Sequence, residues 1–77
     1  MVIVNLRDLM IKKGAIEGKK ITYKDIEEFT GIKNITLSRI ANKPNYNIKT
    51  KHIEKLCKYF DCSIDQLFTI IPDKKNI

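Results

Sequence analysis

Asn34, Ile35 and Arg39 lie within two turns of one another in a predicted helix. On a helical wheel they share one arc with Ser38 and Asn42, and no acidic residue lies in that arc. In the major groove of DNA, Asn pairs with adenine, Arg pairs with guanine, and an apolar side chain contacts the thymine methyl group. A single exposed apolar residue is common in soluble proteins. It is therefore the whole arc that indicates a helix reading DNA bases.

The helix that carries this arc is predicted over about residues 33–42, because Pro44 prevents its continuation. Leu37, Ile40 and Ala41 fall on the opposite arc. We expect these three residues to seat the helix on the core of the protein.

A second helix precedes this one and is expected to support it. It begins after Thr22, and Asp25 occupies the capping-box position three residues later. Gly31 is expected to end it, because a left-handed backbone is common at that position. Three residues are expected on its inner face: Ile26, Phe29 and Thr30.

Three further helices are predicted from caps and from 3.6-residue periodicity. The first helix of the chain begins after Asn5 and is expected to end at Gly14. The fourth covers about residues 50–60, and the fifth runs from a capping box at Ser63 to Pro72. The residues expected to face the core are Leu6, Leu9, Met10, Ile53, Leu56, Cys57, Phe60, Ile64, Leu67, Phe68 and Ile71. These patterns predict an all-α fold with short connections.

The ends of the chain are less regular. Residues 1–4 are apolar and are expected either to form a short edge strand across a dimer or to pack on the helices. Residues 73–77 are expected to form a frayed tail. The 77 residues predict one domain over 1–77, with its core over about 5–71.

Charge and composition narrow the classes of partner. The net charge of +6 and the pI near 9.5 favour a phosphate-bearing partner or an anionic membrane surface. The chain has no apolar run of about 18 residues and no basic leader before its apolar start. We therefore expect a cytoplasmic protein with reduced thiols and no membrane association.

The chain offers few residues for catalysis or metal binding. His52, Cys57 and Cys62 follow an H-x4-C-x4-C spacing, which is not a zinc pattern, so no metal and no cofactor are expected. There is one histidine, no phosphate-binding glycine loop and no nucleophile beside a base. The sequence therefore does not predict an enzyme.

Residues 22–43, followed by "IEKLCKYFDCSIDQLF", resemble the lambda-repressor-like (Cro-type, xenobiotic-response-element-type) helix-turn-helix family. The resemblance depends on Ile26, the turn glycine in "TGI", the segment "TLSRI" and the closing "CSIDQLF", and it spans about residues 5–71. It implies a five-helix DNA-binding domain with the helix-turn-helix at helices 2 and 3. Members of the family are mostly bacterial and phage transcriptional regulators.

The resemblance also implies roles for individual residues. The base-reading positions of the family match Asn34, Ile35 and Arg39. Phosphate contacts would fix the register of the protein on DNA, while base contacts would specify sequence. The residues expected at or near phosphates are Tyr23, Lys33, Thr36, Ser38, Asn42, Lys43, Lys49 and Lys51.

Glu27 departs from the family pattern. The family usually has a small residue, often alanine, where helix 2 crosses the recognition helix. A buried, unpaired carboxylate at that crossing would be costly. Either the helices cross more openly, or Glu27 turns outward and pairs with Lys33 or Arg39. Pairing with Arg39 would weaken base reading there.

These features together predict a sequence-specific regulator of transcription that binds double-stranded DNA in the major groove. The simplest form is a repressor that occludes a promoter as a homodimer. Candidate dimer surfaces are residues 2–4 and the three isoleucines Ile70, Ile71 and Ile77. The alternative is a protein-interaction module, antitoxin-like or an accessory protein of a phage or mobile element, that keeps the fold with weak DNA binding.

Overall fold

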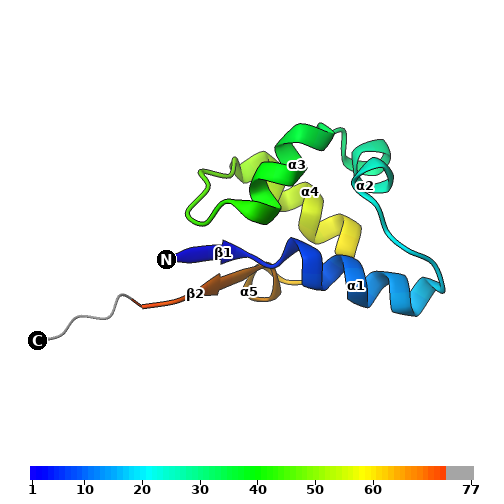
Figure 1. The fold of residues 1–77 in the computed structure, drawn as a ribbon, viewed down its shortest axis with the longest axis horizontal. Coiled ribbons are helices and arrows are strands. Elements are labelled where there is room, and N and C mark those ends of the chain that lie inside the picture. The colour runs from blue at the N-terminus through cyan, green and yellow to red at the C-terminus, as the bar shows by residue number, and fades with distance from the viewer. Residues whose placement is uncertain (73–77) are drawn as a thin grey trace, which may run out of the picture.

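The computed structural model describes residues 1–72, which form five helices and a two-stranded antiparallel ribbon (Figure 1). The elements in chain order are β1 (Val2–Val4), α1 (Leu6–Glu17), α2 (Tyr23–Thr30), α3 (Asn34–Asn42), α4 (Thr50–Phe60), α5 (Ile64–Leu67) and β2 (Phe68–Ile70). The predicted, mostly helical fold is confirmed, and the ribbon is added to it. The predictions of a frayed tail at residues 73–77 and of Ile77 as a dimer contact concern residues outside the described part of the chain.

One apolar core joins the helices and the base of the ribbon. It is made of ten buried residues: Val4, Leu6, Leu9, Ile21, Ile26, Ile32, Leu37, Ile40, Leu56 and Leu67. Among the described residues, no helix is both long and apolar enough to cross a lipid bilayer.

α2 begins and ends at the predicted residues. The Asp25 backbone N–H donates to Thr22 Oγ1 at 3.2 Å, and the Thr22 backbone N–H donates to Asp25 Oδ2 at 2.9 Å. These two hydrogen bonds complete the capping box. The bonds to Thr22 also lower the pKa of the Asp25 carboxyl below its usual value. Gly31 ends the helix in the left-handed region, with φ of 79°.

The prediction that Gly14 ends the first helix is wrong. α1 continues through Gly14 to Glu17, and Gly18 ends it with φ of 70°. A Cβ atom at position 14 would lie 2.5 Å from the carbonyl oxygen of Lys19. Gly14 therefore allows the α1–α2 loop to pack closely against the helix, which the sequence pattern alone does not distinguish from a helix end.

Phe29 was expected on the inner face of α2, and this prediction is also wrong. Its side chain is exposed at the surface. Its ring packs instead against Tyr59 of α4, with 5.1 Å between the ring centroids. The inner face of α2 consists of Ile26 and Thr30, which are both buried.

The predicted extent of the fifth helix is wrong as well. α5 ends at Leu67, and the next three residues form β2, which pairs with β1 in the same chain. Val2 lies opposite Ile70, and Val4 lies opposite Phe68. The apolar start of the chain is thus a strand, and its partner in the described chain is β2.

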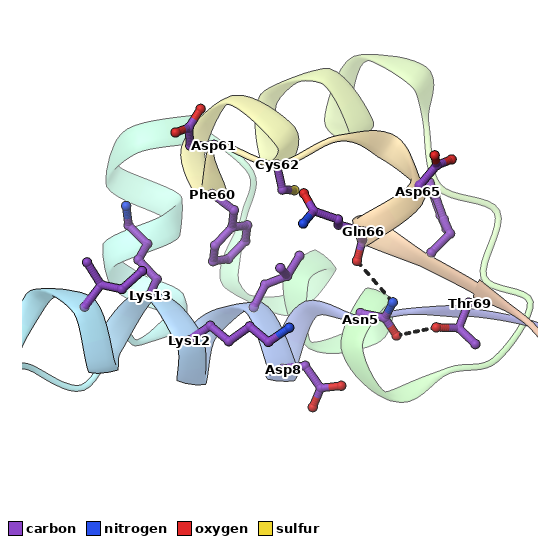
Figure 2. Close-up of a pocket in the computed structure, with 13 residues that line it drawn as sticks. Asn5, Asp8, Lys12, Lys13, Phe60, Asp61, Cys62, Asp65, Gln66 and Thr69 are labelled. Carbon is purple, nitrogen blue, oxygen red and sulfur yellow. Dashed lines mark hydrogen bonds between the residues drawn. The ribbon is translucent and has the colours of Figure 1, made fainter.

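Asn5 connects the start of α1 to α5 and β2. It occupies the predicted N-cap position, but its side chain makes no capping hydrogen bond. Figure 2 shows instead that Asn5 Nδ2 donates to the Gln66 carbonyl oxygen at 3.2 Å, and that Thr69 Oγ1 donates to Asn5 Oδ1 at 2.9 Å. The Asn5 backbone N–H also donates to the Leu67 carbonyl oxygen. These contacts hold the base of the ribbon against the helices.

Candidate nucleic-acid interface

α3 has one face in the core and one face in solvent, as predicted. Leu37 and Ile40 are buried, because their side chains pack against the other helices. Ile35 is 60% exposed, and Asn34 and Arg39 are exposed on the same side of the helix. The outward position of Ile35 means that the core does not account for this apolar residue.

The base-reading candidates are not engaged in the fold. Within residues 1–72, the Arg39 guanidinium and the Asn34 side-chain amide have no hydrogen-bond or ion-pair partner. The same holds for the Tyr23 hydroxyl at the start of α2, although the Tyr23 ring is half-buried. These donors and acceptors can therefore contact DNA without breaking a contact inside the protein.

The turn between α2 and α3 is fixed by Thr30, which is buried. Its hydroxyl donates to the Ile26 carbonyl oxygen at 2.7 Å and accepts from the Ile32 backbone N–H at 3.1 Å. Lys55 Nζ donates to the Thr30 carbonyl oxygen at 3.1 Å. Lys55 thus ties α4 to the end of α2. The turn holds α3 in a defined orientation.

Glu27 caps the start of α3. Its side chain is half-buried, and one predicted alternative was that it turns outward and pairs with Lys33 or Arg39. Within the described residues, however, it makes no ion pair with Lys33 or Arg39. Its Oε1 accepts the Asn34 backbone N–H at 3.2 Å. Lys33, at the N-cap position of α3, provides no side-chain cap, so the carboxylate from α2 takes that role.

Replacing Glu27 by alanine is expected to lower the free energy of unfolding by about 0.5–2 kcal/mol, the usual cost of losing a helix N-cap. Glu27→Gln keeps an acceptor oxygen and should lose less. Urea unfolding followed by circular dichroism measures both. Glu28→Ala is the matched control, since Glu28 is exposed on the same helix. Equal losses in Glu27→Ala and Glu28→Ala would contradict the capping role.

Asn42 is already hydrogen-bonded at the end of α3. Its Nδ2 donates to the Ser38 carbonyl oxygen at 2.8 Å, and its Oδ1 accepts from Arg7 Nη2 of α1. The amide nitrogen has a second N–H, which makes only a long contact of 3.4 Å to Ser38 Oγ, so a phosphate contact would replace that contact alone. Sequence analysis missed Arg7, because its place beside α3 depends on a tertiary contact and no local pattern signals it. Its exposed guanidinium adds a positive charge at this end of the helix.

Exposed lysines flank α3 at both ends. Lys33 directly precedes the helix, and Lys43 directly follows it. Lys49 and Lys51 lie at the start of α4, beyond the loop that joins the two helices (Figure 1). Thr36 is half-buried on α3. Lys33 and Lys43 therefore place a positive charge at each end of α3.

The hollow in Figure 2 is separate from this surface. It has a volume of about 420 Å³ and lies between α1 and the corner where α4 leads into α5. Its lining mixes lysines, Lys12 and Lys13, with acids such as Asp8 and Asp61. Burial raises the pKa of the Cys62 thiol at its wall, which disfavours the reactive thiolate. In the part of the chain that the structure describes, no three His, Cys, Asp or Glu side chains are grouped to hold a metal.

Comparisons with known proteins identify the family to which the helix-turn-helix of α2 and α3 belongs. A family model described as the Cro/C1-type HTH DNA-binding domain matches residues 5–73, which is most of the chain. No curated protein matches the sequence. No solved structure matches it either. The match includes both helices of the helix-turn-helix and the residues that follow them, and the chain belongs to the Cro/C1-type helix-turn-helix DNA-binding domains.

Proposed function

We propose that this protein regulates transcription by binding specific sequences of double-stranded DNA, with α3 in the major groove. The observation that carries the proposal is the outer face of α3. It combines an unengaged amide, an exposed isoleucine and an unengaged guanidinium, at Asn34, Ile35 and Arg39, with no acidic residue in the helix. These three side-chain types are suited to adenine, the thymine methyl group and guanine.

The flanking residues support binding to the phosphate backbone. Lys33 and Lys43 at the ends of α3, and Lys49 and Lys51 at the start of α4, are exposed cations. The Tyr23 hydroxyl at the start of α2 can donate to a phosphate oxygen. We assign phosphate contacts to these five residues, together with Thr36, Ser38 and Asn42.

The form of regulation that we propose is repression. A small domain that occupies a promoter prevents polymerase from binding there and needs no further contact to do so. Two copies on half-sites roughly 34 Å apart would combine their affinities. We therefore propose that the protein acts as a homodimer.

Salt dependence tests the phosphate contacts. The binding constant for duplex DNA should fall linearly with salt on a log–log scale, with a slope of about −0.9 for each phosphate neutralised. Lys49→Ala and Lys51→Ala should each reduce that slope by about one, as measured by fluorescence anisotropy. Lys58→Ala is the control, since Lys58 is exposed near the other end of α4.

Two results would count against this account. If the Lys49 and Lys51 variants kept the slope of Lys58→Ala, the start of α4 would not contact phosphates. If the unmodified protein bound duplex DNA weakly with no salt dependence, the alternative of a protein-interaction module would be favoured.

A further inference from the structure

An open apolar hollow lies between α1 and the loop that leads from α1 to α2. Its volume is about 570 Å³, and small-molecule sites typically have volumes of about 300–1,000 Å³. The wall on α1 consists of two rows of residues spaced one helical turn apart, Arg7, Ile11 and Ala15 in one row and Met10 and Gly14 in the other. All three residues of the first row are exposed, so the core of the protein does not account for them.

The loop supplies the most buried residue of this lining. Ile21 is only 4% exposed. A Cβ atom at position 14 would lie 3.7 Å from Ile21 Cγ1, so the glycine leaves this part of the wall without a side chain. The half-buried ring of Tyr23, at the start of α2, lines the hollow as well. Ile11, by contrast, is 71% exposed. The surface offered to a ligand is therefore mainly aliphatic.

The charged residues that line the hollow are all basic. They are Arg7, Lys19 and Lys20, and no acidic residue among those the structure describes lines it. Lys19 also lines a neighbouring hollow together with the acid Asp25, so its charge is partly balanced. The Lys20 ammonium has no hydrogen-bond or ion-pair partner within residues 1–72. The Arg7 guanidinium donates to Asn42 Oδ1 through Nη2 and keeps further N–H donors.

The size and the charge of the hollow define its occupant. Nine residues line it, whereas a standard protein interface involves about 20–30 residues a side. A DNA phosphate alone would leave the apolar walls uncovered. A lipid bilayer would require apolar side chains that protrude, and this surface is concave. A small molecule with an aliphatic body and one negative charge matches both the apolar walls and the basic residues.

We propose that this hollow binds a medium-chain fatty acid. The carboxylate lies at Arg7, because a planar guanidinium pairs with a carboxylate through two parallel hydrogen bonds. The alkyl chain runs along α1 toward Ala15, between Ile11 and Ile21. From Arg7 to Ala15 the wall extends for about 12 Å, at 1.5 Å per residue, which suits an alkyl group of medium length. Lys20 adds a weaker attraction for the negative charge.

A titration with decanoate, followed by the amide signals of the ¹⁵N-labelled protein, tests the site without DNA. Decanoate is kept below its micelle concentration. The signals of Ala15 and Ile21 should shift and saturate, and those of Cys62 and Gln66, at the separate hollow of Figure 2, should not. Decanol, which has the same chain and no charge, should bind about threefold more weakly. Shifts confined to another surface would overturn the site, and equal affinity for decanol would overturn the assignment of the carboxylate to a basic residue.

Two matched pairs of variants locate the chain and the carboxylate. Ile11→Glu places a negative charge against the alkyl chain and should weaken decanoate binding about tenfold. Ile16→Glu makes the same change at an exposed position of α1 outside this hollow and should leave binding unchanged. Arg7→Gln should abolish the preference for decanoate over decanol, and Lys12→Gln, also outside the hollow, should keep it. Equal binding by the two glutamate variants would refute the proposal.

A second copy of the chain is the other occupant that this experiment detects. If the Ala15 and Ile21 signals moved on dilution of the protein without decanoate, the hollow would be a contact between copies, and the proposal would be wrong.

A regulatory consequence follows, and it rests on the proposed function. Tyr23 lines the hollow and Asn42 is bonded to Arg7, and we assign both to DNA phosphates. A carboxylate bound beside them should repel the DNA, so decanoate should weaken duplex binding by the unmodified protein and affect Ile11→Glu much less. Decanoate that binds in the hollow without changing DNA affinity would overturn this consequence. A protein that selects no DNA sequence would refute the proposed function, while the titration without DNA would still decide the site.

Discussion

Replacing Leu37 by alanine is expected to lower the free energy of unfolding by about 2–5 kcal/mol. Leu37 is fully buried on the inner face of α3 and belongs to the core that joins α3 to the other helices. Removing its side chain deletes buried apolar surface and leaves a cavity. A domain of this size has a small core, so this loss should leave a large fraction of the protein unfolded. Urea unfolding measures the change.

Ile35→Ala is the matched control, because Ile35 lies on the same helix and is exposed. Its effect on unfolding should stay within about 0.5 kcal/mol. Both variants shorten an aliphatic side chain of α3 to alanine, so comparing them contrasts the buried face of the helix with its exposed face. If Ile35→Ala destabilised the fold as much as Leu37→Ala, Ile35 would be a packing residue and its assignment to DNA would fail.

Arg39→Ala is expected to weaken binding to the preferred DNA site by about 1–3 kcal/mol, and to relax the choice of base at one position. The guanidinium is exposed and has no partner among the described residues, so its removal should cost the fold little. Affinity for DNA of unrelated sequence should change much less, because base contacts carry the specificity. Titration of both duplexes with each variant measures the difference.

Lys12→Ala provides the comparison for Arg39→Ala, because it removes one positive charge from α1 beside the hollow of Figure 2. It should reduce binding to the two duplexes equally, if at all. A uniform loss in Arg39→Ala as well would show that Arg39 contacts phosphate and does not read a base.

The helices from α2 to α4 were predictable because their signals are local. Thr22 and Asp25 form a capping box through residues three apart, and Gly31 adopts the left-handed backbone that the turn requires. The two arcs of α3 followed from the helical period, and the burial of Leu37 and the exposure of Ile35 confirm them.

The ribbon was not predictable, because its pairing is not local. β1 and β2 are three residues each and come from opposite ends of the described chain. An apolar stretch as short as Phe68–Ile70 fits the end of a helix as well as a strand. The prediction that Gly14 ends α1 was wrong for a related reason. What distinguishes Gly14 from a glycine at a helix end is the close approach of the Lys19 carbonyl oxygen in the folded chain, which is not a local signal.

The sequence predicted which side chains of the candidate site lie on the exposed face of α3, but it did not predict the contacts that other helices make with α3. Asn34, Ile35 and Arg39 could be placed on one face from sequence, and their DNA contacts remain predictions. The contact from Glu27 to the Asn34 backbone joins two helices, and the contact from Arg7 to Asn42 joins residues 35 apart. Such contacts depend on how the helices pack, which no local pattern specifies.

Selection from a pool of random duplex DNA, with the untagged protein at physiological salt, tests the central claim most directly. The account predicts enrichment of a two-fold-symmetric site, and Arg39→Ala should lose the preference at one base pair of each half-site. Recovery of no preferred sequence, with weak binding that disappears as salt rises, would contradict the claim that α3 reads DNA.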